Sequence, residues 1–148
     1  MAKVTKSIEI EASPEKVFDF INDMKKMNEL RKGSSEGEYT SKGPIGVGST
    51  LHYIGKAGGT QSEWDMEITE FEKNKKISMR TVGASKFKMQ GSHILETTAK
   101  GTKLTNTMNY ELPYSILGKI VDKIRVHKDI EKQVEKQLWD TKKTLEAE

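Results

Sequence analysis

The C-terminal part of the chain carries one long apolar stripe. After Pro113, the stripe residues recur at intervals of three and four, which is the spacing of one face of a helix. The stripe runs through Leu117, Ile120, Val121, Ile124, His127, Val134, Leu138, Thr141 and Leu145. This spacing predicts one helix of roughly 30 residues, or ~45 Å. Such a helix can bury its apolar face only against a surface of similar length, so the rest of the chain must provide that surface.

The middle of the chain, from Glu36 to Leu112, has a different pattern of short alternating runs separated by turn residues. Alternation of apolar and polar residues is typical of half-buried strands. We predict strands at residues 36–42, 49–55, 61–71, 75–82, 86–98 and 102–112. Lys100 and Gly101 supply the left-handed turn of a tight hairpin. Short links cannot form parallel crossovers, so consecutive strands must be antiparallel.

The N-terminal part adds one strand and two short helices. Apolar and polar residues alternate from Lys3 to Glu11, which predicts a half-buried strand. The sequence Ser-Pro-Glu at residues 13–15 then combines an N-cap, a proline at the first helical position and an acidic residue in the first turn. A short helix follows, and the apolar spacing continues for a second helical turn or two until Gly33.

These elements follow one another as one strand, two short helices, six strands and one long helix, which is an α+β arrangement. A chain of 148 residues is expected to form a single domain over residues 1–148. A seven-stranded antiparallel sheet must bury one face, and only the terminal helix is long enough to cover it, so the sheet must curl around that helix. The chain has only 4 Phe, 4 Tyr and 2 Trp to fill the space between them. We therefore expect a cavity between the sheet and the helix.

Charge and composition argue against several classes of protein. The net charge of +3 is spread over the chain without a basic block, which does not indicate nucleic-acid binding. No run approaches the ~20 apolar residues that cross a bilayer, and the N-terminus has no apolar stretch of the kind found in signal peptides. With 0 Cys, the chain has no disulfide framework. We expect a cytoplasmic protein without integral membrane association, as a monomer or weak dimer.

Motifs for familiar catalytic chemistry are missing from the sequence. It contains no Gly-x-Ser-x-Gly elbow, no Gly-x-Gly-x-x-Gly, no Walker loop and no His-Glu-x-x-His. None of His52, His93 and His127 is paired at metal-ligand spacing with another histidine or a cysteine. We therefore predict no metal site and no cofactor.

Alternation assigns a set of side chains to the inner face of the predicted sheet. Together with positions on the helical stripe, they form the candidate ligand-binding site: Trp64, Met66, Met79, Phe87, Met89, His93, Asn106, Met108, Tyr110, Ile120, Ile124 and His127. Methionine is a poor strand former, but its flexible thioether suits a surface that adapts to varied apolar shapes. The methionines therefore either fill gaps in a lean core or line an adaptable pocket for a lipid or an aromatic molecule.

Four polar members of this set could orient a ligand. His93 lies on the inner phase of its strand and His127 on the helical stripe, so both could face one cavity from opposite walls. Each is alternatively a satisfied or partly exposed histidine; a neutral imidazole in the cavity could donate to a ligand carbonyl or act as an acid or base. Tyr110 offers a hydroxyl on an apolar body, and Asn106 is either pocket chemistry or a residue near the end of its strand.

Six segments of the chain resemble the SRPBCC superfamily. This START-like, helix-grip group contains polyketide cyclases/dehydrases, lipid-transfer domains, coenzyme-Q-binding proteins and the birch-pollen allergen type. The segments are Ser7 to Ile21, Gly43 to Ser49, Trp64 with Glu67 to Phe71, Gly101 to Leu104, Tyr110 to Pro113, and Leu138 to Glu146. The resemblance implies a sheet that grips the C-terminal helix, an apolar cavity between them, an entrance near the two short helices, and a gate at Gly43 to Gly48.

These observations leave three hypotheses about function. The first is binding or transport of a small hydrophobic or amphipathic ligand, such as a lipid, a quinone or a polyketide-like molecule, in the internal cavity. The second is a cyclase/dehydrase-type enzyme that acts on a polyketide-like or aromatic substrate. The third is a protein-interaction or chaperone-cofactor role that uses the outer face of the sheet and needs no cavity. Converging polar groups would favour the enzyme, and a filled interior would favour the third role.

Overall fold

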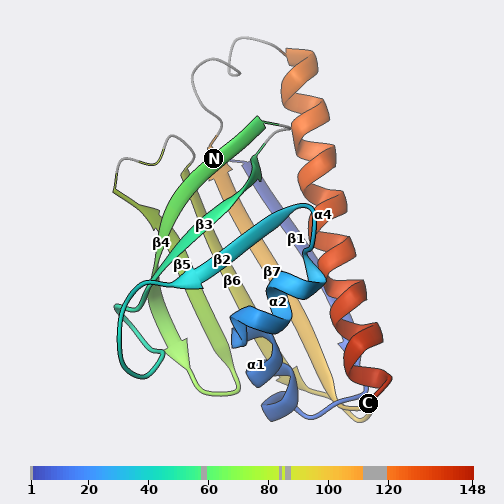
Figure 1. Cartoon of the computed structure of the whole chain (residues 1–148). Coiled ribbons are helices and arrows are strands. Elements are labelled where there is room, and N and C mark those ends of the chain that lie inside the picture. The colour runs from blue at the N-terminus through green and yellow to red at the C-terminus, as the bar shows by residue number, and fades with distance from the viewer. Residues whose placement is uncertain (1, 58–59, 84, 86–87, 112–119) are drawn as a thin grey trace.

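The computed structural model describes residues 2–57, 60–83, 85, 88–111 and 120–148. Its strands and helices follow the predicted order, and Figure 1 shows them along the chain. Their bounds are β1 Ala2–Ile10, α1 Pro14–Asn22, α2 Met24–Leu30, β2 Ser35–Tyr39, β3 Thr50–Ala57, β4 Thr60–Glu72, β5 Lys76–Val82, β6 Lys88–Thr97, β7 Thr102–Glu111 and α4 Ile120–Glu146. The strand predicted at 36–42 ends early, at Tyr39. Parts of the strands predicted at 86–98 and 102–112 lie outside the described residues.

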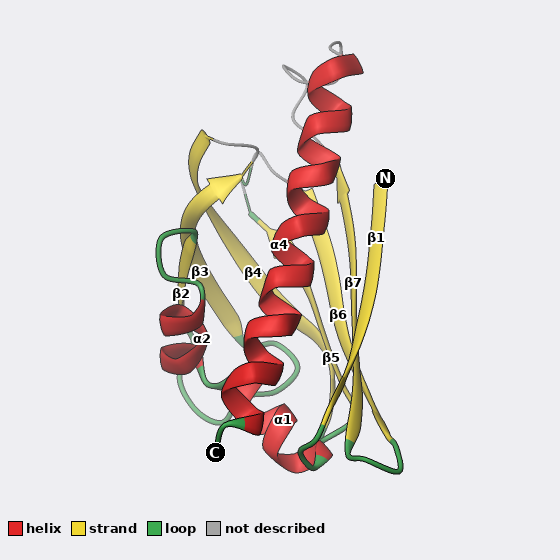
Figure 2. Ribbon diagram, turned by 90° about the vertical axis from the view of Figure 1, so that its right-hand side faces the viewer, coloured by secondary structure: helices red, strands yellow, loops and turns green. Residues whose placement is uncertain are grey.

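The strands form one seven-stranded antiparallel sheet with the order β1-β7-β6-β5-β4-β3-β2. Strands β2 to β7 form a meander, and the last strand, β7, pairs with the first, β1, along the whole length of β1. A register shift between Ile68 and Glu70 marks a bulge in β4, and bulges increase the local twist and bend of a sheet. Figure 2 shows the sheet curving behind α4, which lies across its concave side. The predicted α+β, helix-grip fold is confirmed.

The first short helix begins at the residue that the sequence signals indicate, and the second begins at a cap that those signals did not include. Ser13 is the N-cap of α1, and its hydroxyl accepts from the amide of Lys16 at 3.2 Å. Asp23 both ends α1 and caps α2, where its carboxylate accepts from the amide of Lys26 at 3.2 Å. An acceptor at the N-cap satisfies one of the amides that have no partner within the helix. Because one residue serves both helices, α1 and α2 meet at a sharp corner beside the sheet.

The buried stripe of α4 agrees with the predicted one at Val134, Leu138, Thr141 and Leu145 but departs from it in the first half of the helix. The structure buries Val126, Ile130, Val134 and Leu138, whereas Ile124 is 55% exposed. Steps of four residues back from Leu138 reach Val134, Ile130 and Val126, so these positions share a face. Ile124 is two residues from Val126 and therefore lies about 200° around the helix from it. The prediction was wrong for Ile124 because it joined two runs of apolar residues that lie on different faces.

Polar contacts fix α4 against β1. Lys6 on β1 lies 3.4 Å from a carboxylate oxygen of Glu131 and 2.9 Å from one of Glu135. At the other end of the helix, the carboxylate of Glu146 accepts from the backbone amide of Glu11 at 2.8 Å. These contacts hold the helix at the β1 edge of the concave face. No helix within the described residues is long and apolar enough to cross a membrane.

Candidate functional site

The register of the sheet brings the predicted inner-face residues of the central strands side by side. Gly91 on β6 lies opposite Met79 on β5 and opposite Met108 on β7. Met89, two residues along β6, lies opposite Tyr110. Residues paired in this way project from the same face of a sheet. We call Met79, Met89, Gly91 and Met108 the methionine hollow.

The methionine hollow is open to solvent although it lies in the middle of the sheet. Its three methionines pack against the core but stay only partly buried. A Cβ atom added to Gly91 would meet only the Thr107 carbonyl oxygen, at an ordinary 3.8 Å. Strands β5, β6 and β7 are interior strands, so this exposure does not arise at an edge of the sheet. A side chain larger than that of glycine therefore has room at least for its Cβ atom at this position.

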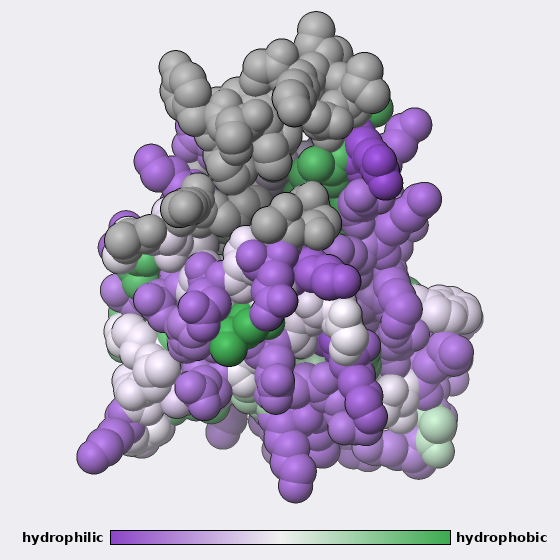
Figure 3. Space-filling view, turned by 45° about the horizontal axis from the view of Figure 1, so that its top comes forward, coloured by the Kyte–Doolittle hydropathy of each residue, from purple (hydrophilic) through white to green (hydrophobic). Residues whose placement is uncertain are grey.

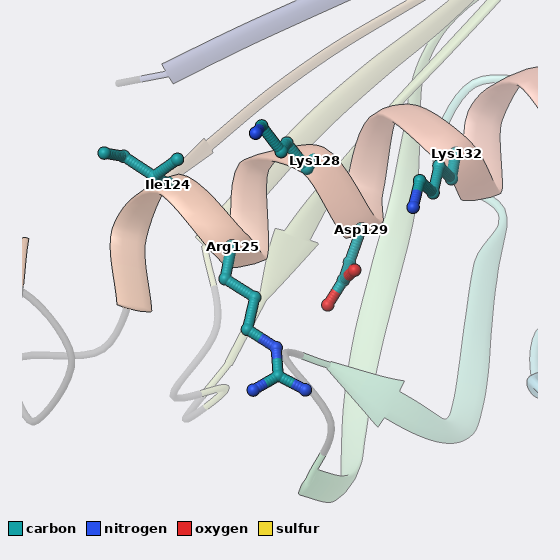
Figure 4. A pocket seen from close by; sticks show the side chains of 5 residues that line it. All are labelled: Ile124, Arg125, Lys128, Asp129 and Lys132. Carbon is teal, nitrogen blue, oxygen red and sulfur yellow. The ribbon is translucent and has the colours of Figure 1, made fainter. Parts of the chain in front are cut away.

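Two surface pockets are described, and neither includes the methionine hollow. The first, of ≈430 Å³, is lined by Ile124, Arg125, Lys128, Asp129 and Lys132 of α4 (Figure 4). These residues lie on the side of the helix opposite its buried stripe. The second, of ≈550 Å³, lies between α2 and the edge formed by β2 and β3. Figure 3 views the molecule towards the start of α4 and shows a mainly hydrophilic surface with small hydrophobic areas.

Other predicted site residues face the interior beside this hollow. Trp64 and Met66 are buried on the inner face of β4, and Asn106 is buried on that of β7. Phe87 and the side chain of Ile120 lie outside the described residues. Ile124 lies on the solvent side of α4 and so does not join the group.

Tyr110, His127 and Glu131 form a hydrogen-bonded series between β7 and α4. The Tyr110 hydroxyl lies 2.5 Å from Nδ1 of His127, and Nε2 of His127 lies 3.1 Å from Glu131. A carboxylate can only accept, so in the neutral ring Nε2 donates to Glu131 and Nδ1 accepts from Tyr110. Burial, and then the nearby charge of Glu131, raises the pKa of the Tyr110 hydroxyl. The hydroxyl therefore stays protonated at neutral pH and remains a hydrogen-bond donor.

Sequence reasoning missed two members of this series. Lys6 extends it through Glu131, and side-chain hydrogen bonds with Glu135 and then Glu131 raise the pKa of Lys6. Lys6 shares the strand phase of the apolar residues Ile8 and Ile10, which is a signal that could have placed it. In the sequence Glu131 stands among charged residues of the terminal helix, a pattern that by itself indicates a solvated face. Only the packing of α4 on β1 shows that it points to Lys6 and His127.

His93 is the second candidate polar anchor. It lies opposite Asn106 in the register of β6 and β7, next to the methionine hollow. Its Nε2 atom is inaccessible to solvent and has no hydrogen-bond partner among the described residues. Burial, and to a lesser extent the charge of Arg31, lowers the pKa of His93 to about 4. The ring is therefore neutral at physiological pH, with one buried polar atom that has no partner among the described residues.

An aromatic stack forms the other wall of the concave face. The rings of Tyr53 and Trp64 are stacked with centroids 5.7 Å apart and planes inclined by 9°. The guanidinium carbon of Arg31 lies 5.4 Å from the centroid of Tyr53. A Cβ atom at Gly37 would come within 2.5 Å of the Tyr53 ring, so glycine leaves room for this ring. Arg31 was not predicted, because one cation after a short helix carries no periodic signal.

A family model described as polyketide cyclase / dehydrase and lipid transport matches residues 1–146. No curated protein sequence matches the chain.

Solved structures share the fold at low sequence identity. TTHA0849 from Thermus thermophilus is 22% identical, with a TM-score of 0.83 over 99% of this chain and 98% of that one. A START superfamily protein from Mycobacterium smegmatis is 16% identical, with a TM-score of 0.77 over 97% of this chain and 98% of that one. The di-domain ARO/CYC BexL from the BE-7585A biosynthetic pathway is 15% identical, with a TM-score of 0.71 over 99% of this chain and 47% of that one.

Proposed function

The chain belongs to the polyketide cyclase/dehydrase and lipid transport family, and on that premise we propose that it binds a small hydrophobic or amphipathic molecule between the sheet and α4. The room at Gly91, where an added Cβ atom would meet only one ordinary contact, carries the proposal. Three partly buried methionines surround this position and can adapt to varied apolar shapes. Burial of apolar ligand surface would drive binding, at ~25 cal/mol per Å².

Polar groups beside the methionine hollow would orient the ligand. The His93 ring and the Asn106 amide face the hollow from one side, and Tyr110 with His127 borders it from the other. A few polar groups in an apolar site are typical of small-molecule pockets, where they set orientation and specificity. Trp64, Met66 and Met79 extend the apolar wall. Phe87 and Ile120 remain predicted members of the site.

The substitution Gly91→Leu tests this site. The Cβ atom of leucine would meet only an ordinary contact at this position, and the rest of the side chain would extend over the methionine hollow, so we expect the protein to fold. We expect it to weaken binding of the neutral fluorescent probe N-phenyl-1-naphthylamine by at least about tenfold, measured by fluorescence titration. Gln90→Leu is the matched control, because the neighbouring side chain is exposed on the outer face of the same strand. Equal binding by wild type and Gly91→Leu would exclude the methionine hollow as the site.

A cyclase/dehydrase activity is the second candidate, and the Tyr110–His127–Glu131 series favours it. The Tyr110 hydroxyl can donate to a carbonyl oxygen of the substrate in place of His127. Nδ1 of His127 is then free to accept a proton from the adjacent carbon, while Glu131 stabilises the imidazolium through Nε2. This arrangement would serve enolisation, which precedes both ring closure and loss of water from a polyketone.

The substitution Tyr110→Phe tests the catalytic candidate. If the protein is an enzyme, we expect the rate of cyclisation of a linear polyketone thioester to fall by about 100-fold, followed by ultraviolet absorbance. Tyr39→Phe is the control, because it removes a hydroxyl that donates to the Asn22 carbonyl. If wild-type protein does not accelerate this reaction over buffer, the catalytic candidate fails and binding alone remains.

A further inference from the structure

Arg31 places a positive charge beside the concave face. It follows the last residue of α2 as its C-cap and is half-buried. Its Nε donates to the Met27 carbonyl oxygen at 3.3 Å, and one terminal nitrogen lies 3.5 Å from the sulfur of Met24. The guanidinium also lies over the Tyr53 ring. These contacts hold the side chain in one orientation without neutralising it.

This cation has no carboxylate partner in the described part of the chain. The ion pairs of the described residues involve Lys6, His52, Lys76, His127, Lys136 and Lys142, and none involves Arg31. A guanidinium has five N–H donors, and only two hydrogen bonds to described residues are formed here. Partial burial of an unpaired charge is costly unless a counter-charge is supplied.

The unpaired cation lies on the same side of the sheet as the methionine hollow. Tyr53, which it covers, and Trp64 project from the inner faces of β3 and β4. Figures 1 and 2 show α2 on the concave side of the sheet, between β2 and α4. The charge of Arg31 also acts on His93, which borders the hollow on β6. A ligand lying over the methionines could therefore reach the guanidinium with one end.

We propose that Arg31 binds the acidic head group of the ligand, so that the ligand is an anionic amphiphile with its apolar part over the methionine hollow. This proposal rests on the proposed binding function and specifies its ligand class. A carboxylate or a phosphate would accept from the free N–H groups of Arg31, in the bidentate geometry that guanidinium favours. The buried Nε2 of His93, which has no partner among the described residues, would bond a second polar group of a ligand that reaches it.

The test compares three ligands that share one alkyl chain and differ in the head group. Decanoate, decyl phosphate and 1-decanol compete with N-phenyl-1-naphthylamine for the wild type, Arg31→Gln and Lys32→Gln. For the wild type, we expect whichever of decanoate and decyl phosphate binds more tightly to compete at least about tenfold more strongly than 1-decanol. Arg31→Gln should remove this advantage and leave 1-decanol unchanged, and Arg31→Lys should restore part of it. Lys32→Gln is the matched control, because it removes an equal charge from the next, exposed residue.

The outcomes separate the head-group proposal from the proposed function. If Arg31→Gln weakens competition by decanoate more than by decyl phosphate, the head group is a carboxylate. If it weakens competition by decyl phosphate more, the head group is a lipid-type phosphate. If Arg31→Gln weakened competition by all three ligands equally, Arg31 would only contribute to the shape of the binding site, and the proposal would be overturned. Unchanged anion binding in Arg31→Gln would also overturn it. Failure of the wild type to bind the neutral probe would instead reject the binding function itself.

Discussion

Replacing Gly101 with alanine is expected to lower the free energy of unfolding by about 3 kcal/mol. Gly101 ends the β6–β7 turn with a φ of 156°. An added Cβ atom would collide with the carbonyl oxygen of Ile10 and lie 2.8 Å from the amide nitrogen of Ala12. Both are backbone atoms where β1 ends, so they cannot move aside without disturbing the pairing of β1 with β7. Urea denaturation at equilibrium measures the loss.

Gly46→Ala makes the same chemical change where a Cβ atom meets nothing within 4 Å. We expect its free energy of unfolding to stay within about 1 kcal/mol of the wild type. If Gly101→Ala proved as stable as Gly46→Ala, the close approach of the turn to β1 would be wrong. The sequence attributes Gly101 to a left-handed hairpin turn, whereas the structure adds a second reason, the contact with a strand about ninety residues earlier in the chain.

Acid is expected to destabilise the protein through His93 by up to about 3 kcal/mol. The pKa of His93 is lowered from 6.5 to about 4 in the folded protein, chiefly by burial. As the pH falls, His93 therefore binds a proton in the unfolded chain at a higher pH than it does in the folded protein. The contribution of His93 to stability is complete above pH 6.5 and is lost as the pH falls towards about 4.

The substitution His93→Met isolates this effect. Between about pH 7 and about pH 4.5, the free energy of unfolding of His93→Met should fall by about 2.5 kcal/mol less than that of the wild type. His52→Gln is a control of opposite sign, because the hydrogen bond with Asp65 raises the pKa of the half-buried His52. The contribution of His52 is present at low pH and is lost as the pH rises through its folded pKa. Identical pH profiles for the wild type and His93→Met would contradict the burial of a neutral imidazole.

The candidate site combines residues that sequence reasoning reached with others that it did not. Alternation placed Met79, Met89, His93 and Met108 on one face of the sheet, and the register confirms that they share it. This worked because successive side chains of a strand project from opposite faces whatever the strand packs against. The same reasoning could not find Arg31, whose position depends on the corner between the short helices and on the aromatic stack of β3 and β4.

Local periodicity alone determined the order of the strands and helices, their approximate bounds and the inward side of each strand. The sequence also determined the start of α1, because a capping side chain binds amides only a few residues away. The tertiary structure decided which strand β1 pairs with, which face of α4 is buried, and that Lys6, Glu131, His127 and Tyr110 meet. These features depend on contacts between segments far apart in the chain. The rotation of a helix over a sheet is set by how the two surfaces interdigitate, and this fit is not encoded in the spacing of residues along either one.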